Sequence, residues 1–165
     1  MSMAANPDVH ATARSGRWLA VGFVAGAVAV PIFHQGVLAL LYAAGLAARP
    51  PYSTTPTAPF GVPQLWSLAF WGGVWGIVLA AFLAAARSRP GYWWRAVLFG
   101  AVAPTLVAWF VVAPLKGQPL AGGWQPAAML TAILVNTAWG VGAALVLRLL
   151  GGAMDSARPQ PHSVQ

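Results

Sequence analysis

The residues best suited to chemistry are polar side chains placed inside long apolar runs. The segment VPIFHQG places His34 and Gln35 shortly after Pro31, and Asn136 lies in a separate apolar run. Polar side chains in the middle of such runs are costly to bury and are candidates for function. His34 is the one of them that changes charge near neutral pH. Two hydroxyl groups in similar surroundings are weaker candidates: Thr105 and Thr131.

Two interpretations of His34, Gln35 and Asn136 are open. At about 1.5 Å per helical residue, His34 lies about 25 Å along its helix from Arg17, and Asn136 lies about 18 Å from Arg148. We therefore expect the three polar side chains to meet at neighbouring depths. They would either hydrogen-bond to one another and to carbonyls freed by the proline, which fixes the helix register, or line a small polar pocket or solute path.

The sequence lacks the residues that most catalytic sites and cofactor sites require. The chain has no cysteine and two acids, Asp8 and Asp155, which lie near its ends. Because no carboxylate pair, Ser/His/Asp set or metal-ligand cluster can be assembled, we predict a non-enzymatic protein with no metal and no cofactor. A b-type haem would need a second axial ligand, which a symmetric dimer could supply through the His34 of each copy. A quinone pocket around His34 is chemically feasible but unspecific.

Composition indicates a membrane protein. Of 165 residues, 59% are hydrophobic and 7% are charged, and the mean hydropathy is +0.69, whereas soluble domains are about 25% charged. The formal net charge of +7 would suggest nucleic-acid binding in a soluble protein. Here the basic residues lie at the ends of apolar runs, so we expect no nucleic-acid partner and interpret the charge as a signal of membrane topology.

Four apolar runs are long enough to cross a bilayer as helices, namely residues 18–44, 65–86, 96–115 and 127–147. The sequence therefore predicts an all-α membrane protein, a four-transmembrane-helix bundle over residues 17–150 with disordered tails at 1–16 and 151–165. A cleaved signal peptide is the alternative for the first run, although secretory apolar regions are about half as long. Five prolines between the first two runs predict a stiff, largely extended connection.

The basic residues divide unequally between the two sides of the predicted spans. Arg49 and Lys116 fall on one side. The other side receives seven: Arg14, Arg17, Arg87, Arg89, Arg95, Arg148 and Arg158. The positive-inside rule places both termini in the cytoplasm, where we expect anionic lipids of the bilayer as partners.

Small residues recur along the spans at the spacing that lets membrane helices approach closely. The glycines of these predicted packing faces are Gly22, Gly26, Gly72, Gly76, Gly100 and Gly140. A weak repeat relates GAVAVP, which begins at Gly26, to GAVAP, which begins at Gly100, and Trp-Gly also occurs in both halves. The chain is therefore interpreted as two duplicated helical hairpins in parallel, the alternative being coincidence in an Ala/Gly/Val-rich background. Pro31 and Pro104, near mid-span, predict helix kinks.

Four segments carry a resemblance to a known family: FHQG, PFGVPQLWSLAFWGGVWG, PTLVAWFVVAPLKGQP and VNTAWGVGAALVLRLL. The chain resembles a family of small, uncharacterised bacterial inner-membrane proteins with four predicted transmembrane helices. The resemblance covers nearly the whole chain between the tails. It implies the fold and a bacterial inner-membrane location, and it supplies no catalytic residue.

These observations favour an interaction, assembly or accessory subunit of the inner membrane that forms a homo-oligomer or binds another membrane protein. The alternative is a small transporter or channel with a polar site around His34, Gln35 and Asn136. An ion path is disfavoured because no Asp, Glu, Lys or Arg lies within a predicted span.

Overall fold

The structure is a computed structural model that describes residues 7–84, 86 and 90–156. Four helical stretches are long and apolar enough to cross a membrane: Gly16–Ala43, Gln64–Ala84, Tyr92–Leu115 and Pro126–Gly151. This confirms the prediction of an all-α four-helix bundle.

Two of the four spans are assembled from successive helical segments. In chain order the elements are α1 (Pro7–Ala29), η1 (Val30–His34), α2 (Gln35–Ala43), β1 (Pro56–Thr57), β2 (Val62–Pro63), α3 (Gln64–Ala84), α4 (Tyr92–Val107), η2 (Ala108–Val112), α5 (Ala113–Leu115), η3 (Leu120–Trp124) and α6 (Pro126–Ser156). The segments η1 and η2 are π-helical, and they join α1 to α2 and α4 to α5 without interruption. The other two spans are the single helices α3 and α6.

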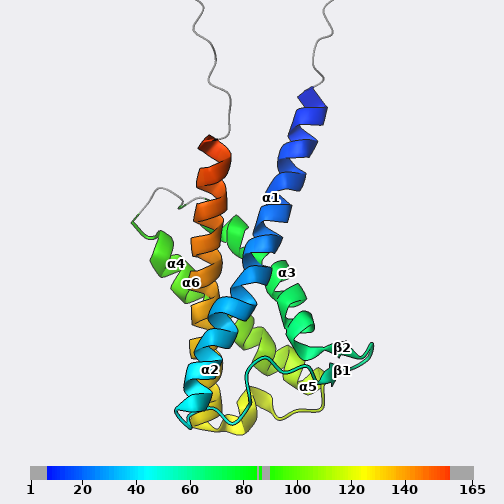
Figure 1. Cartoon of the computed structure of the whole chain (residues 1–165), viewed down its shortest axis with the longest axis vertical. Coiled ribbons are helices and arrows are strands. Elements are labelled where there is room, and N and C mark those ends of the chain that lie inside the picture. The colour runs from blue at the N-terminus through cyan, green and yellow to red at the C-terminus, as the bar shows by residue number, and fades with distance from the viewer. Residues whose placement is uncertain (1–6, 85, 87–89, 157–165) are drawn as a thin grey trace, which may run out of the picture.

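The two ends of the bundle differ in what they carry (Figure 1). One end, called the terminal end below, holds the start of α1, the end of α3, the start of α4 and the end of α6. The opposite end, called the loop end, holds the two longer connections, residues 44–63 and 116–125. Each helical hairpin therefore starts and finishes at the terminal end.

Helices α1 and α6 extend beyond the predicted spans at the terminal end. Helix α1 begins at Pro7. Proline suits the first turn because backbone N–H groups there have no acceptor within the helix, so its missing N–H breaks no hydrogen bond. Helix α6 continues to Ser156. Residues 7–16 and 151–156, which the sequence analysis assigns to disordered tails, are helical in the structure. The remaining tail residues, 1–6 and 157–165, lie outside the described part of the chain.

The two hairpins pack internally through glycines. Helix α1 lies against α3, α4 lies against α6, and a contact between α1 and α6 joins the two pairs. A Cβ added to Gly26 would lie 2.7 Å from the Cα of Gly76, and one added to Gly140 would lie 2.9 Å from the Cα of Gly100. No side chain fits at such separations, so the backbones touch where the sequence predicted close packing.

The glycine contacts recur in the two hairpins in the same order. A Cβ on Gly76 would meet the carbonyl oxygen of Gly22 and then the Cα and N of Gly26. A Cβ on Gly140 would meet the carbonyl oxygen of Ala96 and then the Cα and N of Gly100. This correspondence is the one that the sequence repeat predicts, and it supports the interpretation of the chain as two duplicated hairpins.

The connection between the first two spans is more folded than its prolines suggest. Strands β1 and β2 pair antiparallel, with Pro56 opposite Pro63 and Thr57 opposite Val62. The turn closes with the N–H of Gly61 donating to the carbonyl of Thr57 over 2.8 Å, and Gly61 takes a positive φ of 68°. A small hairpin therefore interrupts the extended connection that we predicted.

The outward surface of the helices is apolar. Large hydrophobic side chains are exposed on every long helix, among them Val24, Phe82, Leu98 and Leu145. The buried core consists mainly of alanine and glycine positions with a few larger side chains, such as Leu79 and Trp139. Because lipid is an apolar solvent, this arrangement fits a multi-pass integral membrane protein whose helices face acyl chains outside and one another inside.

Candidate functional site

The first predicted site residue, Pro31, lies in the π-helical segment η1. Proline has no backbone N–H, so it cannot donate to a carbonyl one turn earlier. Gly26 lies five residues before Pro31, within α1, and its carbonyl oxygen faces the other hairpin. The indole Nε1 of Trp139, on α6, donates to this carbonyl oxygen over 2.9 Å. A side chain from the other hairpin therefore binds the backbone of α1 shortly before the proline.

Gln35, the first residue after η1, binds the connection 44–63. Its side chain is 3% exposed, and its Oε1 accepts a 2.8 Å hydrogen bond from the backbone N–H of Tyr52. The hydroxyl of Tyr52 donates to the carbonyl oxygen of Pro31 over 3.1 Å. Tyr52 has a positive φ of 54°, a conformation that side chains rarely adopt. These two bonds attach the connection 44–63 to the π-helical segment, and we call the group Gln35, Tyr52 and Pro31 the loop clasp.

His34 lies beside the loop clasp and is half-buried. Its Nδ1 is 3.3 Å from the Nε2 of Gln35, so the amide can donate to the ring. The positive charge of Arg49, on the connection after α2, acts on the imidazole. Both acids of the chain, Asp8 and Asp155, belong to the helices that leave the bundle at the terminal end, far along the sequence from this histidine.

Asn136 is not hydrogen-bonded to His34 or Gln35. Its Nδ2 donates instead to the Oγ1 of Thr105 over 2.9 Å, across the contact between α4 and α6. Thr105 is 1% exposed. The predicted meeting of all three polar residues therefore resolves into a pair, His34 with Gln35, and a second pair, Asn136 with Thr105. Asn136 turns toward α4, the neighbour of α6 within its own hairpin.

The second predicted kink residue, Pro104, lies inside α4, and the π-helical segment η2 begins four residues later at Ala108. The backbone N–H of Ala113 donates to the carbonyl of Ala108, which closes the π turn. Both spans that contain a mid-span proline therefore include a π-helical segment. Pro31 lies inside its segment, and Pro104 lies before its segment. Such turns are frequent at functional sites, which makes η1, with its polar side chains, the stronger candidate.

The buried polar atoms of the described residues are all satisfied. Within the described part of the chain, no buried side-chain nitrogen or oxygen lacks a hydrogen-bond partner. The same residues contain no group of three or more His, Asp or Glu side chains placed to hold a metal ion. Fully paired polar groups rigidify a bundle, whereas a binding site leaves donors or acceptors for its ligand.

At the terminal end, aromatic rings surround a basic side chain. The Cζ of Arg148 lies 4.9 Å from the ring centre of Tyr92 and 5.6 Å from that of Trp93. The hydroxyl of Tyr92, in turn, donates to the carbonyl oxygen of Ala144 over 2.7 Å. Stacking of this kind holds a guanidinium near the protein surface while leaving its N–H groups available to anions.

Sequence reasoning did not identify three residues that make these bonds. Tyr52 lies in a proline-rich loop, and Tyr92 sits beside Trp93 and Trp94 in a pattern typical of an interfacial aromatic belt. Trp139 belongs to the Trp-Gly repeat but gives no sign of its acceptor. A usable signal for Trp139 was its position directly before Gly140, because a large side chain next to a close-packed glycine is buried and its indole N–H needs an acceptor.

Comparison with protein-family models, with curated proteins and with solved structures finds no match for this chain. The resemblance to a family of bacterial inner-membrane proteins therefore stays a prediction. The functional argument rests on the geometry of the bundle itself.

Proposed function

We propose that this protein is a non-enzymatic accessory or assembly subunit that acts through contacts with another membrane protein or with a second copy of itself. The observation that carries the proposal is the pairing of its polar side chains. Gln35, Asn136 and Trp139 each make a hydrogen bond to a neighbouring element of the same chain. Each of these groups thus holds the bundle together and leaves the outer, lipid-exposed surface for interaction.

The alternative is a small transporter or channel centred on His34, Gln35 and Asn136. The π-helical segment η1 favours it, because such segments are frequent at functional sites and this one ends at His34. The division of the three residues into two separate pairs weighs against it, since a shared solute site would need them to face one another. An unbroken path for ions would also need charged or polar groups at several depths, whereas the spans contain no Asp, Glu or Lys, and their arginines, Arg17, Arg95 and Arg148, lie near the terminal end of each helix.

The proposed location is the bacterial inner membrane, with the terminal end in the cytoplasm. Arg17, Arg95 and Arg148 support this orientation, because they belong to the helices at the terminal end, where anionic headgroups would be their partners. Four further basic residues counted on this side, Arg14, Arg87, Arg89 and Arg158, have side chains outside the described part. A reporter that is active only in the periplasm should be silent when fused after residue 165 and active when inserted at Thr55. The reverse pattern would exclude the orientation.

Photo-cross-linking in native membranes tests the proposed interaction. A photoreactive amino acid is placed at one exposed position on each span, namely Leu40, Trp71, Leu98 and Leu145, and at the fully buried Leu79 as a control. We expect a discrete protein adduct from one or two adjacent faces and none from Leu79. The adduct mass distinguishes a second copy from another protein. Adducts to lipid alone at every exposed position, with the chain at its natural abundance, would contradict the proposal.

A further inference from the structure

The small hairpin formed by β1 and β2, residues 56–63, projects sideways from the loop end of the bundle (Figure 1). Its turn carries Phe60, whose side chain is 87% exposed, the highest value among the large hydrophobic residues described. The neighbouring Val62 is 40% exposed. The aromatic ring of Phe60 therefore makes few contacts with its own protein and leaves a large apolar surface available for contact with another apolar medium.

Transfer of the hairpin from water to apolar surroundings should cost little free energy. No Asp, Glu, Lys or Arg occurs between Arg49 and Arg87. Three prolines, Pro56, Pro59 and Pro63, have no backbone N–H that would need a partner. The hydroxyl of Thr57 donates to the carbonyl oxygen of Val62 over 2.7 Å, so this polar side chain is already paired within the hairpin. Apolar surroundings would therefore leave few groups of the hairpin unsatisfied.

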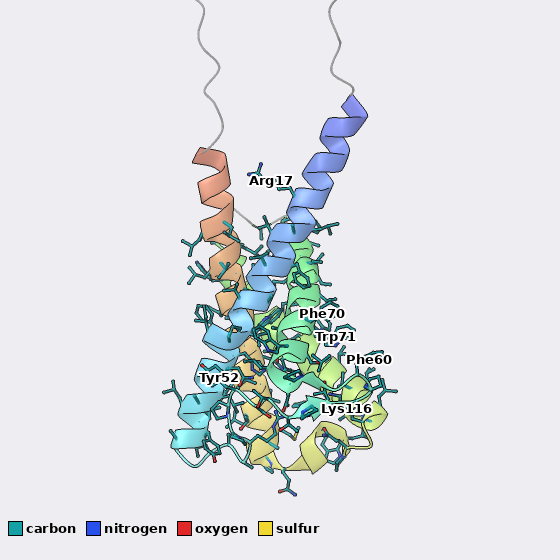
Figure 2. All side chains as sticks on the ribbon, turned by 45° about the vertical axis from the view of Figure 1, so that its right-hand side comes forward. Arg17, Tyr52, Phe60, Phe70, Trp71 and Lys116 are labelled. Atoms are coloured by element: carbon teal, nitrogen blue, oxygen red, sulfur yellow. The ribbon has the colours of Figure 1, made fainter. Side chains whose placement is uncertain are left out.

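The hairpin is continuous with a helix that faces lipid. Strand β2 ends at Pro63 and α3, a membrane span, begins at the next residue. Helix α3 presents Trp66, Phe70 and Trp71 with 66%, 55% and 58% of their surfaces exposed. Figure 2 shows Phe60 on the same side of the molecule as Phe70 and Trp71. The hairpin thus extends the apolar surface of α3 outward at the level where the helix enters the bilayer.

We propose that the β1–β2 hairpin is an interfacial anchor and that Phe60 inserts among the phospholipids of the leaflet at the loop end. Aromatic side chains favour the region between headgroups and acyl chains, where Trp66 at the start of α3 also lies. The anchor fixes the depth of α3 and holds the connection 44–63 against the membrane surface. It depends on the four-span fold and not on the proposed accessory function.

Site-directed fluorescence in vesicles tests the anchor. Because the natural chain has no cysteine, Phe60→Cys and Val62→Cys each give one labelling site for an environment-sensitive NBD dye. Trp71→Cys on the lipid-exposed face of α3 is the membrane reference. Gln118→Cys is the aqueous reference, because Gln118 is exposed on the connection 116–125 between α5 and η3. Phosphatidylcholine vesicles carry spin-labelled lipids or iodide as quenchers.

We expect the dye at Phe60→Cys to emit at shorter wavelength than at Gln118→Cys, to be quenched by the spin-labelled lipid, and to be protected from iodide. For the dye at Phe60→Cys, quenching by the headgroup spin label should exceed quenching by a label deep in the acyl chain. A dye in the middle of α3 should show the opposite order. Emission and iodide quenching equal to those of Gln118→Cys would overturn the proposal. Protection from both lipid and iodide in native membranes would also overturn it, because a protein would then cover the hairpin.

Discussion

The indole nitrogen of Trp139 lies 2.9 Å from the carbonyl oxygen of Gly26, joining residues 113 positions apart in the chain. The acceptor belongs to the glycine pair that brings α1 against α3, and the donor belongs to α6 in the other hairpin. The same nitrogen would lie 3.3 Å from a Cβ added to Gly72. The tightest contact of the first hairpin and the main polar contact between the hairpins therefore coincide.

Removal of this bond should loosen the two hairpins. Trp139→Phe keeps an aromatic ring but loses the N–H donor, so we expect the free energy of unfolding to fall by about 0.6–1.5 kcal/mol for the bond, with a further loss from the smaller ring. Trp75→Phe is the matched control, since Trp75 holds the equivalent place in the repeat and contacts Phe99 edge to face at 5.9 Å. Thermal unfolding in detergent compares them, and equal losses would show that the Trp139 bond contributes nothing.

The glycine contacts predict a steep dependence on side-chain size. Gly76→Ala and Gly140→Ala each place a Cβ against backbone atoms of the facing helix, and we expect each to lose about 1–3 kcal/mol of stability. Gly36→Ala is the control, because nothing lies within 4 Å of a Cβ at this helical position. It should be neutral or stabilising by up to about 1 kcal/mol. Similar melting temperatures for the three variants would mean that the helices separate without cost.

The pair of Asn136 and Thr105 should show energetic coupling. Thr105→Val removes the acceptor and leaves the amide of Asn136 without its partner, while Asn136→Leu removes the donor. We expect each single variant to be less stable than the wild type and the double variant to recover part of the loss. The expected coupling energy is about 0.6–1.7 kcal/mol. Additive losses in the double-mutant cycle would show that the 2.9 Å contact is not a working bond.

The loop clasp predicts amide protection at a single loop residue. The N–H of Tyr52 donates to Gln35, so its hydrogen exchange should be slow in the wild type and in Gln35→Glu, which keeps an acceptor. Gln35→Leu should speed this exchange by about tenfold, the loss expected for one hydrogen bond of about 1.4 kcal/mol. Tyr52→Phe removes only the bond to Pro31 and should leave the amide protected. Fast exchange at Tyr52 in the wild type would exclude the clasp.

Much of the fold follows from hydropathy and glycine spacing. The second span was predicted to begin at Leu65 and begins at Gln64, whereas the third was predicted from Ala96 and begins at Tyr92. The difference arises because Trp93, Trp94 and Arg95 have the composition of a membrane boundary but still have helical backbone. The repeat also indicated which glycines are equivalent, and the facing pairs Gly26 with Gly76 and Gly100 with Gly140 follow that equivalence.

The polar contacts were less predictable because they depend on rotation about the helix axis. Counting residues gives the depth of His34 and Asn136, but the side to which each points is fixed by the crossing of neighbouring helices. The hydrogen-bond partner of Gln35 was even harder to predict from the sequence. It comes from a loop whose path depends on a positive φ at Tyr52, a conformation that sequence pattern does not indicate for tyrosine.

Water access to the paired residues of α4 and α6 tests the central claim, that the polar side chains hold a dry bundle together. Thr105→Cys and Asn136→Cys, in the otherwise cysteine-free chain, are treated in sealed vesicles with small water-soluble thiol reagents from either side. Gln118→Cys is the reactive reference, and Leu106→Cys, exposed toward lipid beside Thr105, is the unreactive one. The account predicts that the cysteines at both positions of the pair stay as unreactive as Leu106→Cys. Modification of either at a rate near that of Gln118→Cys would reveal a water-filled path and contradict it.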